Sequence, residues 1–140
     1  MYVLDTDILS LLFAGHPPVL GRQTTVPSSE IAITIVTRIE VLQGRFDFLL
    51  RAASGDELLR AQDWLDRTVR SLAQVETVIA IDVATAAQFD SLRKNKKLKK
   101  IGRRDLLIAA ISLAERATLV TRNLKDFRHV PGLQVENWAD

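Results

Sequence analysis

The sequence predicts an α/β fold, a three-layer α/β/α sandwich around a mainly parallel sheet of four or five strands, in a single domain over residues 1–140. Two observations predict it. Short apolar strand patterns alternate along the chain with helix patterns, which implies right-handed crossovers between parallel strands. The run 31–36 is almost unbrokenly β-branched and apolar, as expected for a strand covered on both faces.

The elements follow one another at regular intervals. Strand patterns cover residues 2–4, 31–36, 78–81, 118–121 and 133–135, the last expected at an edge. Helix patterns cover residues 8–13, 37–53, 56–74, 82–92 and 106–117. Asp7 and Asp82 are expected as N-caps, and Gly15 with the following Pro pair is expected to close the first helix. The pattern 56–74 is amphipathic, whereas 106–117 is apolar nearly all round and is therefore expected to be buried.

The composition fits one packed globule. Of the 140 residues, 47% are apolar and 26% charged, which excludes a disordered or collagen-like chain. The absence of cysteine excludes disulfides, thiolate zinc sites and thiol nucleophiles. The longest uncharged stretch, 8–21, is broken by His16, Pro17 and Pro18 and falls short of the roughly 20 apolar residues of a bilayer span. We expect a cytoplasmic protein with no membrane segment.

The net charge of +2 is an average over two unlike regions. The segment 93–104 carries eight Lys or Arg and no acid, so the rest of the chain sums to −6. Such a run is usually a solvated helix end and loop. Because this one leads directly into Asp105, some of its cations are expected near the acidic site, where they can hold the phosphates of a polyanion. The same cations could instead meet acidic groups of a protein partner.

Four acids come from separate segments that lead to one edge of the expected sheet. Asp5 ends the first strand, Glu40 lies one turn beyond the second, Asp105 starts the helix before the fourth, and Asp126 follows the fourth. In open parallel sheets, ligands bind beyond the carboxyl ends of the strands. We therefore expect these carboxylates to face one cavity.

Carboxylates that share a cavity repel one another unless a cation compensates them. A donor set of oxygens without His or Cys favours Mg²⁺, with Mn²⁺ as a substitute. Such an ion can activate a bound water and shield the charge on a phosphorus under attack. The inferred chemistry is metal-dependent phosphodiester hydrolysis.

Each acid also has a purely structural interpretation. Thr37 and Glu40 fit a capping box at a helix start. Asp105 fits the first turn of a helix, where the helix dipole favours an acid, and Asp126 could tie down a turn with Asn123. Asp5 is the hardest to explain in this way, because a charge directly after an apolar strand needs a partner.

The sequence resembles the PIN-domain nucleases, and among them the VapC-type toxins of bacterial toxin–antitoxin pairs. Four motifs in order carry the resemblance, and it covers nearly the whole chain. They are YVLDTD at 2–7, TRIEVLQG at 37–44, IGRRDLLIAA at 101–110 and LVTRNLKDF at 119–127, with PGLQVENW at 131–138 as a matching ending. The resemblance implies a PIN-like fold, a metal-dependent endoribonuclease and inhibition by a small VapB-type antitoxin. Homodimers are common in the family, and one is expected here.

By this resemblance, Asp5, Glu40 and Asp105 are the metal-binding acids. The fourth acid has two candidate positions in the family. Many members carry an Asp where this chain has Asn123, whereas others use the acid at the position of Asp126. The catalytic set is therefore expected to be Asp5, Glu40, Asp105 and Asp126. Glu40 is expected to orient or deprotonate the attacking water, and a supporting shell is expected from Thr6, Thr121 and Asn123.

RNA contacts are expected from the basic segment that precedes Asp105. The expected RNA-binding residues are Lys96, Lys97, Lys99, Lys100, Arg103 and Arg104. The aromatic side chains Phe46, Phe48, Trp64 and Phe89 lie in helix patterns and are expected in the core or in an interface, not as base-stacking platforms.

Three other functions are alternatives to a metal-dependent nuclease. A metal-free ribonuclease would need a pair of histidines, and nothing in the local sequence pairs His16 with His129. A receiver-like phosphoacceptor would need an Asp ending its central strand, whereas the strand before Asp82 continues into a helix. A non-catalytic RNA- or protein-binding module on the same fold stays open, favoured by the amide at Asn123.

Overall fold

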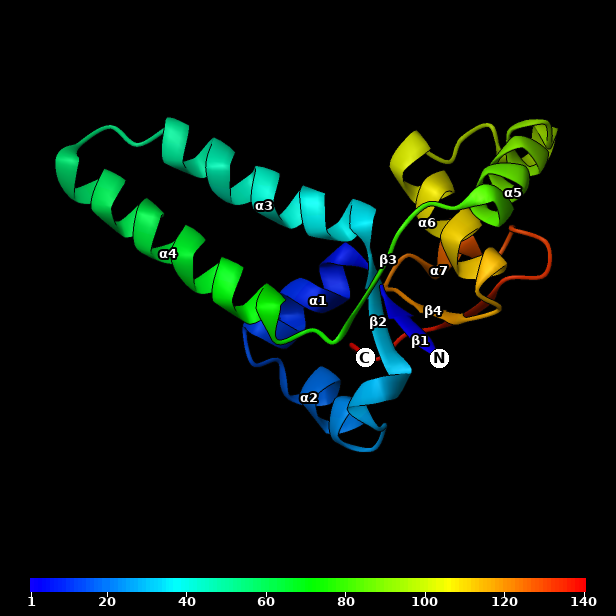
Figure 1. Ribbon diagram of the computed structural model, residues 1–140, viewed down its shortest axis with the longest axis horizontal. Coiled ribbons are helices and arrows are strands. Elements are labelled where there is room, and N and C mark those ends of the chain that lie inside the picture. Colours follow the sequence, from blue (N-terminus) through cyan, green and yellow to red (C-terminus); the bar gives the residue numbers. More distant parts are fainter.

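The computed structural model, which describes residues 1–140, is built on a five-stranded sheet in which every strand is parallel to its neighbours (Figure 1). The strand order is β3-β2-β1-β4-β5. The strands are β1 (Tyr2–Leu4), β2 (Ile31–Thr34), β3 (Thr77–Ile79), β4 (Thr118–Val120) and β5 (Gln134–Glu136). The expected parallel sheet and the edge position of the last strand are confirmed.

Helices cover both faces of this sheet. They are α1 (Thr6–Phe13), α2 (Pro17–Thr24), α3 (Ile35–Leu50), α4 (Gly55–Ala73), α5 (Val83–Arg93), α6 (Arg103–Ala114) and α7 (Leu124–Phe127), with short 3₁₀ turns η1 (Ser28–Glu30) and η2 (Lys96–Leu98). Side chains alternate along each strand, so Val3 packs with α5, α6 and α7, whereas Leu4 packs with α1 and α2. The three-layer sandwich predicted from the sequence is confirmed.

Helices α3 and α4 form an antiparallel hairpin that extends away from the sheet (Figure 1, left). Only the ends of the two helices nearest the sheet reach the core, through Val41 on α3 and Leu72 on α4. Toward the tip the hairpin lacks a third layer, so large apolar side chains such as Leu50 and Leu59 are two-thirds exposed.

The beginnings of α1 and α2 differ from the expectations. Asp5, not Asp7, is the N-cap of α1, and its side chain accepts from the Thr6 N–H at 2.8 Å. The Pro pair does end the first helix, but Pro17 also begins α2, because proline fits the first turn of a helix where no N–H is needed.

The second strand is shorter than predicted. It ends at Thr34, whose hydroxyl accepts from the Thr37 N–H at 3.1 Å and caps α3, so Thr37 lies inside that helix. The Asp82 cap of α5 is confirmed, with Oδ1 accepting from the Thr85 N–H. The strand before Asp82 is an edge strand, and the central strand is β1, which ends at Asp5. The expectation that took the strand before Asp82 as the central one is therefore wrong. None of the helices combines the length and the apolarity that a bilayer crossing requires.

Candidate active site

The central feature of the site is Asp5, at the carboxyl end of the central strand. Its backbone N–H donates to the Val120 carbonyl at 2.9 Å, which continues the β1–β4 pairing past the end of β1. The residue is only 7% exposed, and its carboxylate accepts from the Thr6 N–H and from Thr121 Oγ1, each at 2.8 Å. Asp5 is therefore buried, and its two carboxylate oxygens are hydrogen-bonded by Thr6 and Thr121. These are the hydrogen-bond partners that a charge directly after an apolar strand needs.

A chain of hydrogen bonds runs from Thr121 to the fourth acid. Thr121 Oγ1 accepts from the Asn123 N–H at 3.0 Å, and Asn123 Nδ2 donates to Asp126 Oδ2 at 3.1 Å. The Asn123 side-chain oxygen accepts in turn from the Asp126 N–H at 3.4 Å, which starts the short helix α7. Asp126 thus lies in a helix, not in the loop expected from the sequence, and Asn123 both caps that helix and orients the Asp126 carboxylate.

Glu40 joins the site from α3. Its Oε1 accepts from Thr6 Oγ1 at 3.0 Å, and the Thr6 hydroxyl also lies 3.0 Å from the Thr37 hydroxyl. The capping-box interpretation of Thr37 and Glu40 is wrong, because Thr34 caps the helix and the Glu40 carboxylate is bonded across to α1. Thr37, which was expected only as a helix start, also contacts the site through the Thr6 hydroxyl.

Arg104 connects the basic segment to the acids. Its Nη1 lies 3.4 Å from Glu40 Oε2, in an ion pair whose Arg side chain is largely exposed and whose Glu side chain is mostly covered. Of the six basic residues expected to bind RNA, Arg104 is the one that forms an ion pair with a site acid.

Asp105 lies in the first turn of α6, half-buried, as expected. Burial raises the pKa of this carboxyl, and the charges of Glu40, Asp126 and Asp7 raise it further. The acids that act on Asp105 come from α1, α3 and α7, so carboxylates from four helices lie near enough to influence one another's charge.

The same effect acts on Asp5. Burial raises the pKa of Asp5 from an ordinary 3.8 to about 6, against the opposing hydrogen bonds from Thr121 and Thr6. The charges of Asp7 and Asp105 contribute to the increase. Asp7 is therefore a member of the acidic cluster, which we define as Asp5, Asp7, Glu40, Asp105 and Asp126. Asp7 was expected only as a helix cap, although its spacing two residues after Asp5 was a signal for a shared site.

The donor chemistry of the acidic cluster fits a hard divalent cation, but its side chains do not form a closed metal cage. All five side chains offer carboxylate oxygens. A bound cation would oppose the burial and the neighbouring charges that raise the pKa of Asp5 and Asp105. As the side chains stand, no three of them converge into a group that could hold a metal ion.

The four expected RNA-binding lysines lie in and just after η2, and all are exposed. None of them forms an ion pair. The guanidinium groups of Arg93 and Arg103 both lie over the Phe89 ring, at 5.8 and 5.7 Å from its centroid. These cations therefore form an unneutralised surface between α5 and α6.

The histidines and aromatic residues bear on the other expectations. His16 Nε2 lies 3.0 Å from the Ala139 carbonyl, a structural contact outside the acidic cluster. Phe89 packs partly against the core, as expected. Phe46, Phe48 and Trp64 lie on the hairpin and are 38–50% exposed, so the structure rules out the core for them and leaves an interface as the prediction.

Comparison with known proteins identifies the family and several relatives of this chain. The family model described as PIN domain matches residues 2–133. Ribonuclease VapC2 of Rickettsia felis is 30% identical over 142 residues, and ribonuclease VapC1 of Haemophilus influenzae is 26% identical over 141 residues, each alignment covering 99% of this chain and 98% of the relative.

Solved structures show the same fold. VapBC2 from Rickettsia felis, crystallised with a DNA fragment from its promoter, matches with a TM-score of 0.77 and 27% identity, covering 98% of both chains. VapBC-1 from nontypeable Haemophilus influenzae matches with a TM-score of 0.71 at 22% identity, covering 99% of this chain and 98% of that one. Because the PIN domain model matches residues 2–133, nearly the whole chain, this chain belongs to the PIN domain family.

Proposed function

We propose that this protein is a Mg²⁺-dependent endoribonuclease that hydrolyses RNA phosphodiester bonds, and that it is the toxin of a VapBC-type toxin–antitoxin pair. The observation that carries the proposal is the buried carboxylate of Asp5, which Thr6 and Thr121 hold at the end of the central strand. Its burial raises the pKa to about 6, and the charges of Asp7 and Asp105 contribute to the increase. A fold that only needed stability would gain from a neutral side chain there. Relatives with the name ribonuclease VapC support the reaction.

Asp5, Glu40 and Asp105 are the residues that would hold the metal. When bound, Mg²⁺ supplies charge compensation for the phosphate and lowers the pKa of a water nucleophile, and Mn²⁺ can replace it. Thr121 orients Asp5 by donating to Oδ2, and Thr6 orients Glu40 by donating to Oε1. The second carboxylate oxygen of Glu40, Oε2, contacts Arg104 and accepts no hydrogen bond from Thr6. When RNA binds Arg104 in its place, Oε2 can orient or deprotonate the attacking water.

Asp126 is proposed as the fourth acid of the catalytic set. Its carboxylate is held by Asn123 and raises the pKa of Asp105, which supports a position in the cluster. Asn123 is then a positioning residue, in keeping with its neutral amide.

The partners follow from the same comparisons. Related structures hold VapB and VapC chains together, which supports a VapB-type antitoxin as the partner here. The exposed apolar hairpin of α3 and α4 supports a homodimer, because large apolar side chains gathered on one surface usually mark an interface.

The test of the activity is to incubate the purified protein with total RNA in Mg²⁺, Mn²⁺ or EDTA, beside an Asp5→Asn variant. We expect cleavage with either metal, none with EDTA, and loss in the variant at unchanged fold by circular dichroism. Cleavage that persists in EDTA or in Asp5→Asn would contradict the proposal.

A second candidate, a non-catalytic RNA- or protein-binding module, is favoured by one observation: no three carboxylates converge as they stand. It predicts RNA binding without cleavage under every metal condition. The same experiment therefore separates the two functions.

The basic segment is tested by neutralising Lys96, Lys97, Lys99 and Lys100 together to Gln. Each phosphate contact contributes about 0.7 to the salt slope for single-stranded nucleic acid, so four contacts would flatten the slope by up to about 3. The measurement is RNA affinity at several salt concentrations with Mg²⁺ omitted. A matched control neutralises four exposed cations in and directly after the hairpin helices: Arg38, Arg51, Arg60 and Arg70. An unchanged slope in the lysine variant would assign these cations to the antitoxin instead.

A further inference from the structure

A second polar site lies away from the acidic cluster, in a cavity of about 470 Å³ between α1 and the hairpin. It is lined by Ser10, Phe13, Ala14, Arg45, Trp64, Arg67, Thr68 and Ser71. None of the five carboxylates of the acidic cluster lines it. Its distinguishing residue is Arg45 on α3.

The Arg45 side chain is held in a fixed position. Its Cζ lies 3.8 Å from the centroid of the Trp64 ring, and its Nε donates to Thr68 Oγ1 at 3.0 Å. The Thr68 hydroxyl, which is buried, donates in turn to the Trp64 carbonyl at 2.9 Å. The ring and the hydroxyl thus fix the plane of the guanidinium and use one of its donors, which leaves the two Nη groups free.

The charge of Arg45 has no anionic partner. The four ion pairs in the structure involve the N-terminus, Arg22, Arg67 and Arg104, but not Arg45. Burial lowers the pKa of Arg45, with no acid close enough to oppose the effect. A partly desolvated cation with two free, coplanar donors is preorganised for a planar anion such as a carboxylate.

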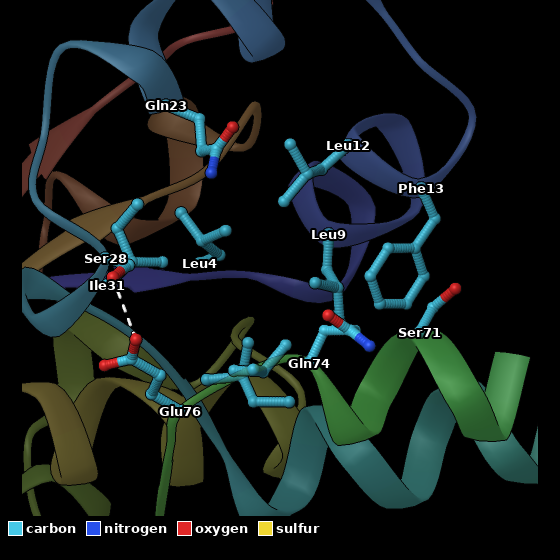
Figure 2. A pocket seen from close by; sticks show the side chains of 12 residues that line it. Leu4, Leu9, Leu12, Phe13, Gln23, Ser28, Ile31, Ser71, Gln74 and Glu76 are labelled. Atoms are coloured by element: carbon cyan, nitrogen blue, oxygen red, sulfur yellow. Dashed lines mark hydrogen bonds between the residues drawn. The ribbon is translucent and has the colours of Figure 1, made fainter.

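The surroundings favour a protein carboxylate over an RNA phosphate. Phe13 and Ser71 also line a neighbouring cavity of about 150 Å³, which is apolar through Leu9, Leu12 and Val75. Figure 2 shows Phe13 and Ser71 side by side at one end of this second cavity. Nucleic-acid interfaces are strongly basic and polar, whereas protein interfaces combine apolar pockets with a few fixed charges. The two cavities together provide an apolar pocket next to a fixed cation.

We propose that Arg45, held by Trp64 and Thr68, is a subsite for an Asp or Glu side chain of a protein segment whose neighbouring apolar side chain enters the cavity of Figure 2. The inference rests on the proposed function only for the identity of the partner, an antitoxin chain. The chemistry of the subsite follows from the contacts of Arg45.

The first experiment titrates the full-length protein with acetate, as a carboxylate probe, and with dimethyl phosphate, as a probe for the RNA backbone, at constant ionic strength. The readouts are the NMR signals of the Arg45 Nε–H and the Trp64 indole N–H. We expect saturable shifts with acetate and weaker binding of dimethyl phosphate. Both anions can match the fork, but the acetate oxygens are the more basic hydrogen-bond acceptors, and the two ester groups make dimethyl phosphate bulkier. Tighter binding of dimethyl phosphate, or no saturable shift with either probe, would overturn the proposal.

The second experiment selects binders from a displayed library of random peptides. Enriched peptides are expected to carry an acid beside an apolar residue, and to lose about tenfold in affinity when the acid is replaced by its amide or the protein carries Arg45→Gln. Arg45→Lys should retain part of the affinity, and Arg70→Gln, an exposed α4 control, all of it. Enrichment of peptides without an acid, equal binding to Arg45→Gln, or no enrichment would each count against the subsite.

The outcome is separable from that of the proposed function. Arg45→Gln should cleave RNA like the wild type, because Arg45 lies outside the acidic cluster. Asp5→Asn should keep the acetate shift at Arg45. Loss of RNA cleavage in Arg45→Gln at unchanged stability would instead place Arg45 in RNA binding and reject the subsite.

Discussion

The acidic cluster and the α3–α4 hairpin are opposite in how they are stabilised. The cluster concentrates like charges in a buried place and holds them with hydrogen bonds from Thr6, Thr121 and Asn123. The hairpin leaves Leu50 and Leu59 two-thirds exposed and lacks a third layer at its tip. The first region sets a single cation, Arg104, against five carboxylates, whereas the second lacks a covering surface.

This difference indicates two kinds of missing partner. A carboxylate cluster is relieved by a cation, and an apolar surface is relieved by another protein surface. Substitutions in the cluster should therefore change chemistry and pH dependence, and substitutions at the hairpin tip should change association alone.

The largest effect is expected for Asp105→Asn. This change removes one carboxylate of the cluster and should lower RNA cleavage by about 100-fold or more, the usual cost of losing one charge-stabilising group in a reaction site. The measurement is the rate of metal-dependent cleavage at saturating Mg²⁺. Asp66→Asn, on the exposed side of α4, is the matched control and should cleave at the wild-type rate.

A second effect concerns the pH dependence of stability. The raised pKa of Asp5 means that the folded state binds a proton more tightly than the unfolded state, so stability falls as the pH rises from about 4 to about 6. Above this window the charged Asp5 costs roughly 2–3 kcal/mol. Urea unfolding in EDTA should therefore show that Asp5→Asn gains stability relative to wild type between pH 4 and pH 7.5, by about that amount. Asp90→Asn, on exposed α5, should show no such trend.

A smaller effect is expected for Thr121→Val. The change removes the hydroxyl that donates to Asp5 Oδ2, so it should raise the Asp5 pKa further and destabilise the protein by about 1–2 kcal/mol at pH 7. Unfolding at pH 5 and pH 7.5 measures both consequences. Thr118→Val, whose hydroxyl makes only a long contact to Gln134 at 3.3 Å, is the control. Equal costs for the two variants would show that the Thr121 hydroxyl does not support Asp5.

The smallest change in stability is expected at the hairpin. Leu50→Ser combined with Leu59→Ser should alter the free energy of unfolding by less than about 0.5 kcal/mol per site, because both side chains are mostly exposed. Sedimentation should nevertheless show a dimer for the wild type and a monomer for the double variant. A wild-type monomer at all concentrations would refute the proposed homodimer.

The parts predicted from sequence are those where position along the chain determines position in space. The carboxyl ends of parallel strands meet at one edge, so Asp5 at the end of β1 could be assigned to the site from its place in the pattern. Asp105 followed for a similar reason, since the helix that it starts returns to β4.

Other features depended on contacts that a local pattern does not contain. Thr37 and Glu40 have the spacing of a capping box, yet Thr34 is the N-cap of the helix. The Glu40 carboxylate instead accepts a hydrogen bond from Thr6, thirty-four residues earlier in the chain. Asp7 belongs to the cluster because its charge raises the pKa of Asp5 and of Asp105, and Asp105 lies almost a hundred residues further along the chain. The extension of the hairpin was also hidden, because an amphipathic pattern shows that a helix has an apolar face but not whether that face is covered.

The pairing of β1 with β4 also determines when the site can form. Thr121 and Asp5 are separated by 116 positions in the chain, so their contact needs segments that are made far apart in time. A chain is synthesised from its N-terminus at about 5–20 residues per second, so Asp5 and Glu40 are made several seconds before Asp105, Thr121 and Asp126. If the proposed nuclease site assembles in this order, it stays incomplete on the growing chain until the segment that carries Thr121 and Asp126 has been made and has folded against β1.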